Sequence, residues 1–378
     1  MPDRPAEPYL LTPGPLTTAA SVKRAMLRDW GSRVREFVEL NARIRHRLTA
    51  LAGSEGTHIC VPLQGSGTFV VEAMLGTMVP REGKLLVLAN GAYGQRMVRM
   101  AQYHGREVQA LDTPEDTPND LAALDAALGG DPAITHVAAV YCETTSGILN
   151  PIDTIAKVTA RHGRRLLIDA MSAFGALPLD AREVSFEAVA ASANKCLEGV
   201  PGVGFAIVRE DALEGAAGRA PALSLDLFEQ WRAMERNGQW RFTPPTHVLA
   251  ALDQALSEHA EEGGIEGRGA RYRENCRILV EGMRDLGFEQ LLPEHLRAPI
   301  IVTFKMPADR RFRFESFYER LRERGYVIYP AKLTVAESFR IGCIGRLGPA
   351  EMRGALNAIR ETLTEMGVAS GRPAPPAA

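Results

Sequence analysis

The stretch Ala191-Ser-Ala-Asn-Lys195-Cys-Leu-Glu-Gly-Val-Pro-Gly-Val-Gly204 places one lysine between a run of small residues and a glycine-rich loop. The apolar residues 188–191 predict a buried strand, so Lys195 comes just after a strand end. An isolated lysine is ordinarily a surface residue. Here the small neighbours leave room beside the amine, and the glycines allow another group to approach closely. Lys195 is therefore a candidate for chemistry.

A carboxylate occupies a similar position earlier in the chain. Asp169 directly follows the apolar run Leu166-Leu-Ile168 and precedes Lys195 by one predicted helix-and-strand unit. Ligands of an open α/β sheet bind beyond the carboxyl ends of its strands. Asp169 and Lys195 can therefore lie at neighbouring strand ends, although an aspartate there can also cap a helix or bind a metal.

Strands and helices alternate through the first two thirds of the chain. Apolar runs predict strands over residues 84–89, 135–141, 165–168 and 188–191, and amphipathic spacing predicts helices over 36–51, 69–79 and 152–161. Such alternation favours an α/β fold with a mostly parallel sheet between helices.

Four regions are predicted along the chain. Residues 1–20 form a proline-rich, extended N-terminal arm in which prolines disfavour a helix. Residues 21–245 form the large domain. Residues 246–368 form a smaller C-terminal α/β domain, with helices over 246–262, 268–286 and 349–366 and strands near 299–304, 326–329 and 338–343. The proline- and alanine-rich residues 369–378 are predicted to be disordered.

Composition excludes several classes of function. The chain has 378 residues, with 44 Lys+Arg against 46 Asp+Glu, so neither a nucleic-acid surface nor a polybasic membrane segment is indicated. No apolar stretch is long enough to span a bilayer, and the N-terminus lacks a signal core. Five scattered cysteines indicate neither a disulfide scaffold nor a zinc site. These features predict a cytoplasmic protein.

A third motif, Leu63-Gln-Gly-Ser-Gly-Thr-Phe69, opens a predicted helix. Free amides and the positive helix end beside Ser66, Gly67 and Thr68 can hold a phosphate, although a plain helix cap explains the motif equally well. Val70 stands where a dinucleotide fingerprint has its third glycine, and no lysine follows as in a Walker loop.

A phosphate cradle, a carboxylate and a lysine together match the needs of pyridoxal 5′-phosphate (PLP). The helix start would bind the phosphate, Asp169 would keep the pyridine nitrogen protonated, and Lys195 would form the Schiff base. Tyr93, in Asn90-Gly-Ala-Tyr-Gly94, can cover the ring or be an ordinary core aromatic.

With these motifs the chain resembles the fold-type I PLP-dependent enzymes, in the class-V aminotransferase family. The resemblance covers roughly residues 8 to 365. Within the family it extends to transaminases that use 2-aminoethylphosphonate as amino donor. Further stretches that carry it are Leu10-Leu-Thr-Pro-Gly-Pro-Leu-Thr17, Asp29-Trp-Gly-Ser-Arg33, Cys142-Glu-Thr-Thr-Ser-Gly147 and Phe339-Arg-Ile-Gly342.

The resemblance implies a role for each matched residue. Lys195 is the Schiff-base lysine, Asp169 the partner of the pyridine nitrogen, and Tyr93 the ring cover. Ser66, Gly67 and Thr68 form the phosphate cradle. The remaining expected site residues are Thr145 beside the ring oxygen or the cradle, Thr243 reaching the phosphate from the neighbouring subunit of a homodimer, and Arg340 gripping the acidic end of the substrate.

Arg33 is expected to be a second cation at the pocket mouth. The alternative is that Arg33 packs on Trp30 or pairs with Asp29. One departure from the family pattern is Pro244-Pro245, where a small residue is expected before the second proline.

The reaction implied is transfer of the amino group of 2-aminoethylphosphonate to pyruvate, giving phosphonoacetaldehyde and L-alanine in phosphonate catabolism. The alternative within the fold is a serine or alanine aminotransferase with pyruvate or glyoxylate as acceptor, because a fold does not determine its substrate. A cysteine desulfurase is disfavoured, since Tyr93 takes the ring position and Cys343 lies in a predicted strand. A non-catalytic binding protein and a nicotinamide-dependent dehydrogenase are further alternatives. The intact set of motifs argues against the first, and the missing third glycine argues against the second.

Overall fold

The computed structural model describes residues 7–331, 333 and 336–375. A seven-stranded sheet forms its centre, in the order β2-β10-β9-β8-β5-β3-β4. The strands are β2 (His58–Gly65), β3 (Lys84–Ala89), β4 (Glu107–Asp112), β5 (Ile134–Val140), β8 (Arg165–Asp169), β9 (Ala188–Ser192) and β10 (Gly202–Arg209). Strand β10, which pairs with β2 and β9, runs opposite to the other six strands, which are all parallel to one another. The predicted mostly parallel α/β fold is confirmed.

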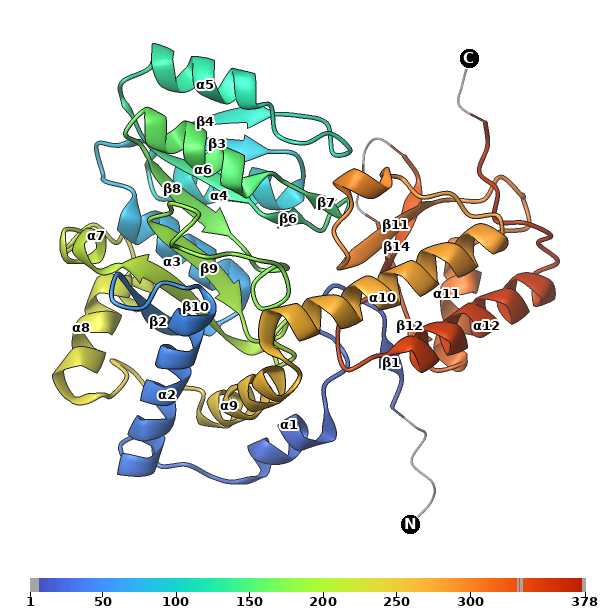
Figure 1. Ribbon diagram of the computed structural model, residues 1–378, viewed down its shortest axis with the longest axis horizontal. Helices are drawn as coiled ribbons and strands as arrows, with labels where there is room; N and C mark the ends of the chain where they lie inside the picture. The colour runs from blue at the N-terminus through green and yellow to red at the C-terminus, as the bar shows by residue number, and fades with distance from the viewer. Residues whose placement is uncertain (1–6, 332, 334–335, 376–378) are drawn as a thin grey trace.

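Helices cover both faces of this sheet (Figure 1). One layer holds α3 (Gly67–Met78), α4 (Ala92–Tyr103), α7 (Glu210–Glu214) and α8 (Leu227–Asn237), and the other α2 (Arg35–Leu51), α5 (Leu121–Gly130), α6 (Ile152–Arg161) and α9 (Thr246–Glu261). The sequence of strand β3 is continuously apolar because both faces of the strand are covered. Leu85 and Val87 pack into the first layer, whereas Leu86 and Leu88 pack into the second.

The smaller domain contains an antiparallel sheet of β11 (Ile301–Lys305), β14 (Ser338–Gly342) and β13 (Tyr329–Pro330). The helices α10 (Gly264–Asp285), α11 (Phe314–Glu323) and α12 (Pro349–Glu365) pack around a core rich in phenylalanine, including Phe288, Phe304 and Phe339. Figure 1 shows α10 extending from the large domain into the small one. This helix therefore links the two domains.

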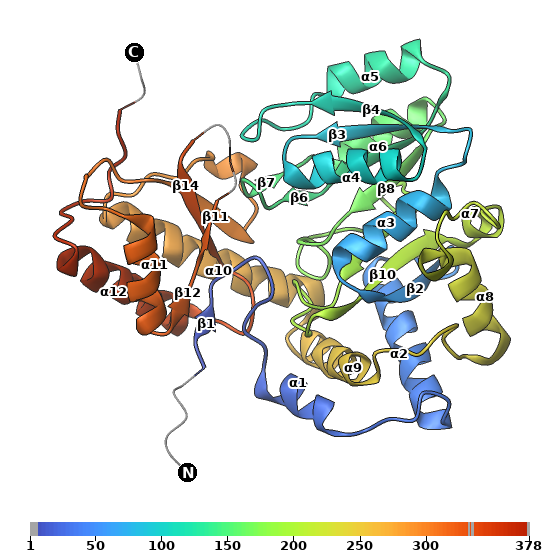
Figure 2. The ribbon, with the colours of Figure 1, turned by 180° about the vertical axis from the view of Figure 1, so that it is seen from behind.

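The N-terminal segment joins the small domain. Strand β1 (Tyr9–Leu10) pairs in parallel with β12 (Tyr326–Val327), as Figure 2 shows, and Leu11 lies in the small-domain core. The chain then returns to the large domain through α1 (Ala20–Arg24) and a 3-10 turn, Ala25–Leu27, both beside α9. Residues 1–6 of the predicted arm lie outside the described residues.

The predicted domain boundary at residue 246 is wrong. Helix α9 packs against α2, and its Leu249, Leu252 and Leu256 belong to the core of the large domain. The core of the small domain takes its first α10 residue at Cys276. Hydrophobic periodicity predicted α9 itself correctly, but it cannot tell which of two neighbouring cores a helix joins.

The prediction of a disordered tail is wrong for its first residues. The amide of Gly371 donates to the carbonyl of Leu286 (2.8 Å), and the amide of Ala308 donates to the carbonyl of Arg372 (2.8 Å). These backbone partners lie in the small domain and hold the tail against it. Residues 376–378 lie outside the described residues.

Short elements complete the fold, namely a hairpin of β6 (Cys142–Glu143) and β7 (Ile148–Leu149) and two 3-10 turns, Leu223–Leu225 and Glu294–Leu296. Within the described ranges, no helix has both the length and the apolar character needed to cross a bilayer.

Candidate active site

The site lies at one edge of the large sheet. Because β10 alone runs in the opposite direction, the carboxyl ends of β2, β8 and β9 all lie at this edge. They lead into Ser66, Ala170 and Ala193, and Lys195 follows two residues later. A cavity of about 210 Å³ opens there. Its lining includes six of the predicted residues, namely Ser66, Gly67, Thr68, Tyr93, Asp169 and Lys195.

Asp169 is the last residue of β8, and its carboxyl group is buried (4% exposed). Burial raises its pKa to about 6, although the Met171 amide, which donates to Oδ1 (2.9 Å), and the charges of Lys195 and Arg96 oppose the rise. Asp169 is therefore ionised at neutral pH and lacks a cationic side chain in hydrogen-bonding contact among the described residues. A protonated ring nitrogen would supply that cation.

Lys195 lies in the turn that follows β9. Its Nζ donates a hydrogen bond to the carbonyl oxygen of Pro13 (2.8 Å). Burial lowers the pKa of the amine, and the nearby Cys196 and Asp169 only partly oppose this effect. A lowered pKa enlarges the neutral, nucleophilic fraction of the amine, which is what Schiff-base chemistry requires.

The start of α3 fits an anion. Ser66 is the N-cap residue, yet its side chain makes no capping hydrogen bond, so the first amides of the helix have no side-chain cap. A Cβ atom at Gly67 would lie 2.4 Å from Sδ of Met171, so a larger residue there would have to displace the Met171 side chain, which also lines the cavity. The hydroxyl of Thr68 accepts a hydrogen bond from Nη1 of Arg96 (3.2 Å). The Arg96 guanidinium thus lies beside the predicted phosphate cradle.

Tyr93 is held in the cavity by the start of α4. Its amide donates to Oε2 of Glu143 (3.1 Å), and the guanidinium of Arg96 lies 4.8 Å from the centre of its ring. Glu143 also accepts a hydrogen bond from the amide of Gly94 (3.4 Å). The Glu143 carboxyl group is buried, and burial raises its pKa. Glu143 therefore caps α4 from outside the helix.

Thr145 lies one residue away from the cavity wall, and its predicted contact with the cofactor stays a prediction. Its hydroxyl accepts from the amide of Ala92 (3.1 Å) and donates to Oε1 of Glu143. Thr145 therefore holds the α4 cap and does not line the cavity, whereas Thr144 does. Both threonines lie in the turn between β6 and β7, where neighbouring side chains take different directions.

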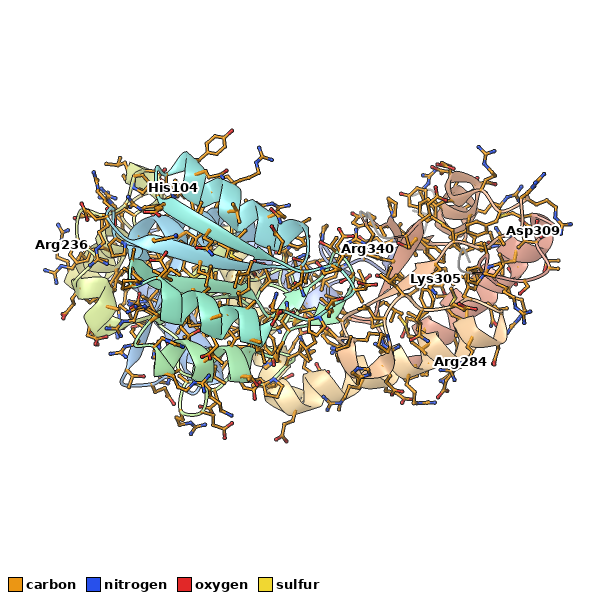
Figure 3. The ribbon with its side chains drawn as sticks, turned by 90° about the horizontal axis from the view of Figure 1, so that it is seen from above. His104, Arg236, Arg284, Lys305, Asp309 and Arg340 are labelled. Carbon is orange, nitrogen blue, oxygen red and sulfur yellow. The ribbon has the colours of Figure 1, made fainter. Side chains whose placement is uncertain are left out.

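Arg340 comes to the site from the small domain (Figure 3). It lies in β14 with its side chain buried, and burial lowers its pKa. Nη1 donates to the carbonyl of Thr144 (2.6 Å) and Nη2 to that of Pro330 (3.0 Å), whereas Nε has no partner. Arg340 is thus attached to the cavity wall at Thr144 and keeps an unpaired donor.

Arg33 and Thr243 do not line the cavity of their own chain. Both are exposed, Arg33 in the loop before α2 and Thr243 between α8 and α9. The two other partners considered for Arg33 are engaged elsewhere. Oδ1 of Asp29 lies 3.1 Å from Nε2 of His247, and the Arg28 guanidinium lies 4.0 Å from the centre of the Trp30 ring.

Sequence reasoning missed several residues of the lining, namely Gly14, Arg96, Thr144, Ser172, Ser192 and Asn194. Ser192 and Asn194 flank the motif lysine, and the hydroxyl of Ser192 donates to Oδ1 of Asn194 (3.0 Å). Their position beside Lys195 in the sequence could have identified them as residues of the site. Arg96, one helical turn after Tyr93, carried no comparable indication.

The donor set fits PLP. A buried carboxylate, a buried amine and an uncapped helix start match a pyridinium, an aldehyde and a phosphate respectively. Comparisons with known proteins agree with this fit. Residues 24–325 match the family model described as aminotransferase class-V. The chain belongs to the class-V aminotransferase family.

Two curated relatives are each described as a 2-aminoethylphosphonate–pyruvate transaminase. The protein of Pseudomonas putida (strain W619) is 54% identical over 361 residues, covering 96% of this chain and 98% of the relative. That of Paraburkholderia xenovorans (strain LB400), whose name carries the number 1, is 56% identical over 379 residues, covering 100% of this chain and 97% of the relative. The solved PLP-bound phosphoserine aminotransferase of Trichomonas vaginalis shares the fold, with a TM-score of 0.74 and 17% identity over 94% of this chain and 100% of that one.

Proposed function

We propose that this chain moves the amino group of 2-aminoethylphosphonate to pyruvate, with PLP as cofactor. The observation that carries the proposal is that Lys195, Asp169 and the uncapped start of α3 line one cavity. The substrates follow from the relatives, which are 54% and 56% identical over nearly the whole chain. For the competing serine or alanine aminotransferase activity, the solved alanine–glyoxylate aminotransferase of Nostoc sp. is only 23% identical and supports the fold alone.

Three groups of residues would hold the cofactor. The first amides of α3 with Ser66 and Thr68 would bind its phosphate, Asp169 its ring nitrogen, and Lys195 its aldehyde carbon. Tyr93 would cover the ring. When bound, PLP supplies an electron sink and carries the amino group between the two substrates, which no side chain of the chain can do.

Lys195 would also move the proton that transamination requires. The amine, once free of its covalent bond, can take the proton from the donor carbon beside nitrogen and later return it. The lowered pKa of Lys195 favours the neutral amine that accepts this proton. The carboxylate of Asp169 would stabilise the positive charge at the ring nitrogen throughout.

Arg340 would bind the acidic end of both substrates. A guanidinium fits a carboxylate or a phosphonate with two hydrogen bonds, so one residue can serve donor and acceptor. Its unpaired Nε and the proximity of Nη1 to the cavity wall at Thr144 support this role. Arg340 would exchange its backbone carbonyl partners for the substrate anion.

A homodimer would complete the site. Large apolar side chains are exposed at several places in the large domain, namely Leu27, Val34, Phe69, Leu223 and Phe242. Thr243 adjoins Phe242, and Arg33 adjoins Val34. We therefore expect Thr243 and Arg33 to reach the cavity of the partner subunit from such an interface, Thr243 at the phosphate and Arg33 at the pocket mouth.

Mixed dimers test this sharing of residues. Lys195→Ala chains and Thr243→Val chains, each impaired alone, would form hybrids in which one site has both residues intact. Recovery of activity on mixing would support a shared site. No recovery in proven hybrids would contradict it.

We also propose a cytoplasmic location. All five cysteines are buried and free, as expected for a protein kept in a reducing compartment. Fractionation of the source cells with an antibody would test this.

An amine-donor screen tests the proposed reaction. Alanine formation from pyruvate would be followed with 2-aminoethylphosphonate beside serine, taurine and β-alanine. We expect 2-aminoethylphosphonate to exceed the others by orders of magnitude in kcat/KM. Preference for serine, or for alanine with glyoxylate as acceptor, would replace the phosphonate assignment with the alternative within the fold.

A further inference from the structure

The turn that carries Lys195 has an unusual backbone. The amide of Glu198 donates to the carbonyl of Lys195, and that of Gly199 to the carbonyl of Ala193 (2.8 Å each). Glu198 has φ 59°, the only positive φ at a non-glycine residue in the described part of the chain. This left-handed conformation is unfavourable for a residue that has a β-carbon. Other contacts must therefore hold the turn.

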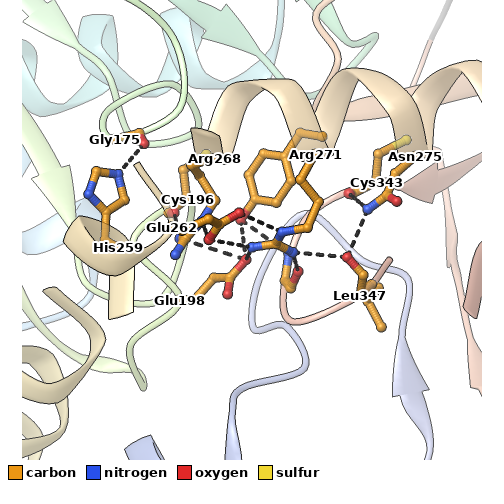
Figure 4. A network of polar contacts seen from close by, with 12 residues as sticks. Gly175, Cys196, Glu198, His259, Glu262, Arg268, Arg271, Asn275, Cys343 and Leu347 are labelled. Carbon is orange, nitrogen blue, oxygen red and sulfur yellow. Dashed lines mark hydrogen bonds and ion pairs between the residues drawn. The ribbon is translucent and has the colours of Figure 1, made fainter. Parts of the chain in front are cut away.

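Those contacts come from one face of α10 (Figure 4). The Glu198 carboxylate is buried (4% exposed) and accepts hydrogen bonds from the Tyr272 hydroxyl (2.6 Å) and from Nη2 of Arg271 (2.7 Å). Nη1 of Arg268 donates to the carbonyl of Cys196, the residue after the lysine. The Glu198 side chain and the Cys196 carbonyl group therefore both attach the turn to α10.

The same face of α10 also holds the loop that follows the Arg340 strand. The Tyr272 hydroxyl accepts a hydrogen bond from the amide of Gly345 (3.3 Å), and Nη1 of Arg271 donates to the carbonyls of Gly345 and of Leu347 (2.9 Å). One hydroxyl group thus joins the lysine turn to the segment five residues after Arg340.

Charge within the network is balanced. Glu198 and Glu262 carry two negative charges, and Arg268 and Arg271 carry two positive charges, with Glu262 accepting from both Nε atoms (2.7 Å each). Burial opposes ionisation of Glu262, but the hydrogen bond from Arg271 and the charge of Arg268 outweigh it and lower its pKa to about 2. An apolar cluster of similar size would be about as stable as such a buried network. What the network adds is a fixed geometry for its attached segments.

We propose that Tyr272 is a positioning residue, whose hydroxyl sets the distance and orientation of the Lys195 amine relative to the substrate anion site at Arg340. The two groups come from different domains, and α10 is a helix that extends from one domain into the other. Proton transfer needs the amine close to a carbon of a substrate whose far end Arg340 holds. A displacement of about 1 Å between such groups can cost about a hundredfold in rate. This inference rests on the proposed transamination.

The test uses the full-length holoenzyme of the Tyr272→Phe variant, which keeps the ring and loses only the bridging hydroxyl. Single-turnover reaction with 2-aminoethylphosphonate, followed by cofactor absorbance, gives the maximal rate and the apparent Kd of the donor. PLP titration and thermal melting of the apoprotein give two readouts that do not depend on turnover. We expect the maximal rate to fall about tenfold, with both Kd values within about twofold of wild type.

Tyr326→Phe is the matched control, since it removes a hydroxyl from the small domain away from the network. Its maximal rate should match wild type. If Tyr272→Phe lowers only the melting temperature, or loses rate only through weaker binding, the hydroxyl is structural and the proposal falls. Equal loss in the two variants would overturn it as well.

A double-mutant cycle with Glu198→Gln adds an independent check. If the hydroxyl acts through Glu198, the two losses in maximal rate are not additive. Additive losses would contradict the proposed route. If wild type itself fails to transaminate, the proposed function fails. If wild type turns over and Tyr272→Phe keeps its rate, only the positioning role fails.

Discussion

Nζ of Lys195 lies 2.8 Å from the carbonyl oxygen of Pro13, although 182 residues separate the two in the chain. The next residue, Gly14, has φ +122°, and a Cβ atom there would lie 2.6 Å from Cδ and 2.7 Å from Nζ of Lys195. The N-terminal segment therefore forms a wall of the cavity directly against the reactive amine.

Gly14→Ala should accordingly disable the amine without unfolding the protein. The added methyl group displaces Lys195, and a misplacement of about 1 Å costs about a hundredfold in turnover. The measurement is kcat together with the rate of PLP incorporation into the apoprotein. Gly56→Ala is the control, because Gly56 also has a positive φ (+78°) but has no atom within 4 Å of a built Cβ. Similar kcat values for the two variants would refute a specific role for Gly14.

Lys195→Ala should lose the covalent bond to the cofactor and at least about a thousandfold in turnover, because nucleophile and proton carrier disappear together. Borohydride reduction followed by mass spectrometry of the peptides measures the bond directly. Lys84→Ala, on the opposite edge of the sheet, should leave the labelled peptide unchanged. Labelling of another lysine in the wild-type chain would contradict the assignment of Lys195 as the Schiff-base lysine.

Asp169→Asn should make the apoprotein more stable at neutral pH while abolishing most activity. The folded pKa of Asp169, about 6, exceeds its ordinary value of 3.8, so the folded state binds the proton more tightly than the unfolded one. Stability due to this group therefore falls as pH rises from about 4 to 6, and the full penalty, up to about 3 kcal/mol, applies above pH 6. Asparagine avoids it and still accepts from the Met171 amide.

Denaturant unfolding of the two apoproteins at pH 4 and pH 7 measures this effect. The variant should gain stability over wild type at pH 7 and little at pH 4. A variant that is less stable than wild type at pH 7 would show that the buried charge is already compensated.

Arg340→Ala should raise KM for both 2-aminoethylphosphonate and pyruvate. Loss of a charge-assisted hydrogen bond costs about 1.5–3 kcal/mol, which corresponds to roughly 10–150-fold in affinity. Steady-state kinetics with each substrate varied in turn measures it. An increase for one substrate alone would mean that phosphonate and carboxylate bind at separate cationic sites.

Glu143→Ala should lower stability and loosen Tyr93. The amides of Tyr93, Gly94 and Thr145 would lose their acceptor, at about 1 kcal/mol or more for each buried donor. Each kcal/mol corresponds to roughly 2–4 °C in Tm for a domain of this size. Thermal melting measures the loss, with exposed Glu183→Ala as the control. A Tm equal to that of the control would exclude the capping role.

Much of the fold could be predicted from local patterns. The strand over residues 84–89 and the helix over 152–161 have the predicted bounds, because continuous apolar runs and helical periodicity are local properties. The placement of α9 and the ordered residues 369–372 were not predictable in this way. Both depend on which surface a segment meets after the chain has folded.

The sequence by itself determined the mostly parallel sheet and the residue types that follow its strands. Asp169, Lys195 and the Ser66–Thr68 motif lie around one cavity, because the carboxyl ends of parallel strands lie at a common edge of the sheet. Only the tertiary structure decided that Thr144 and not Thr145 lines the cavity, that Pro13 contacts the lysine amine, and that Tyr272 joins the lysine turn to the loop after the Arg340 strand. These contacts join segments distant in the sequence, and the packing between two domains selects them, which no local pattern encodes.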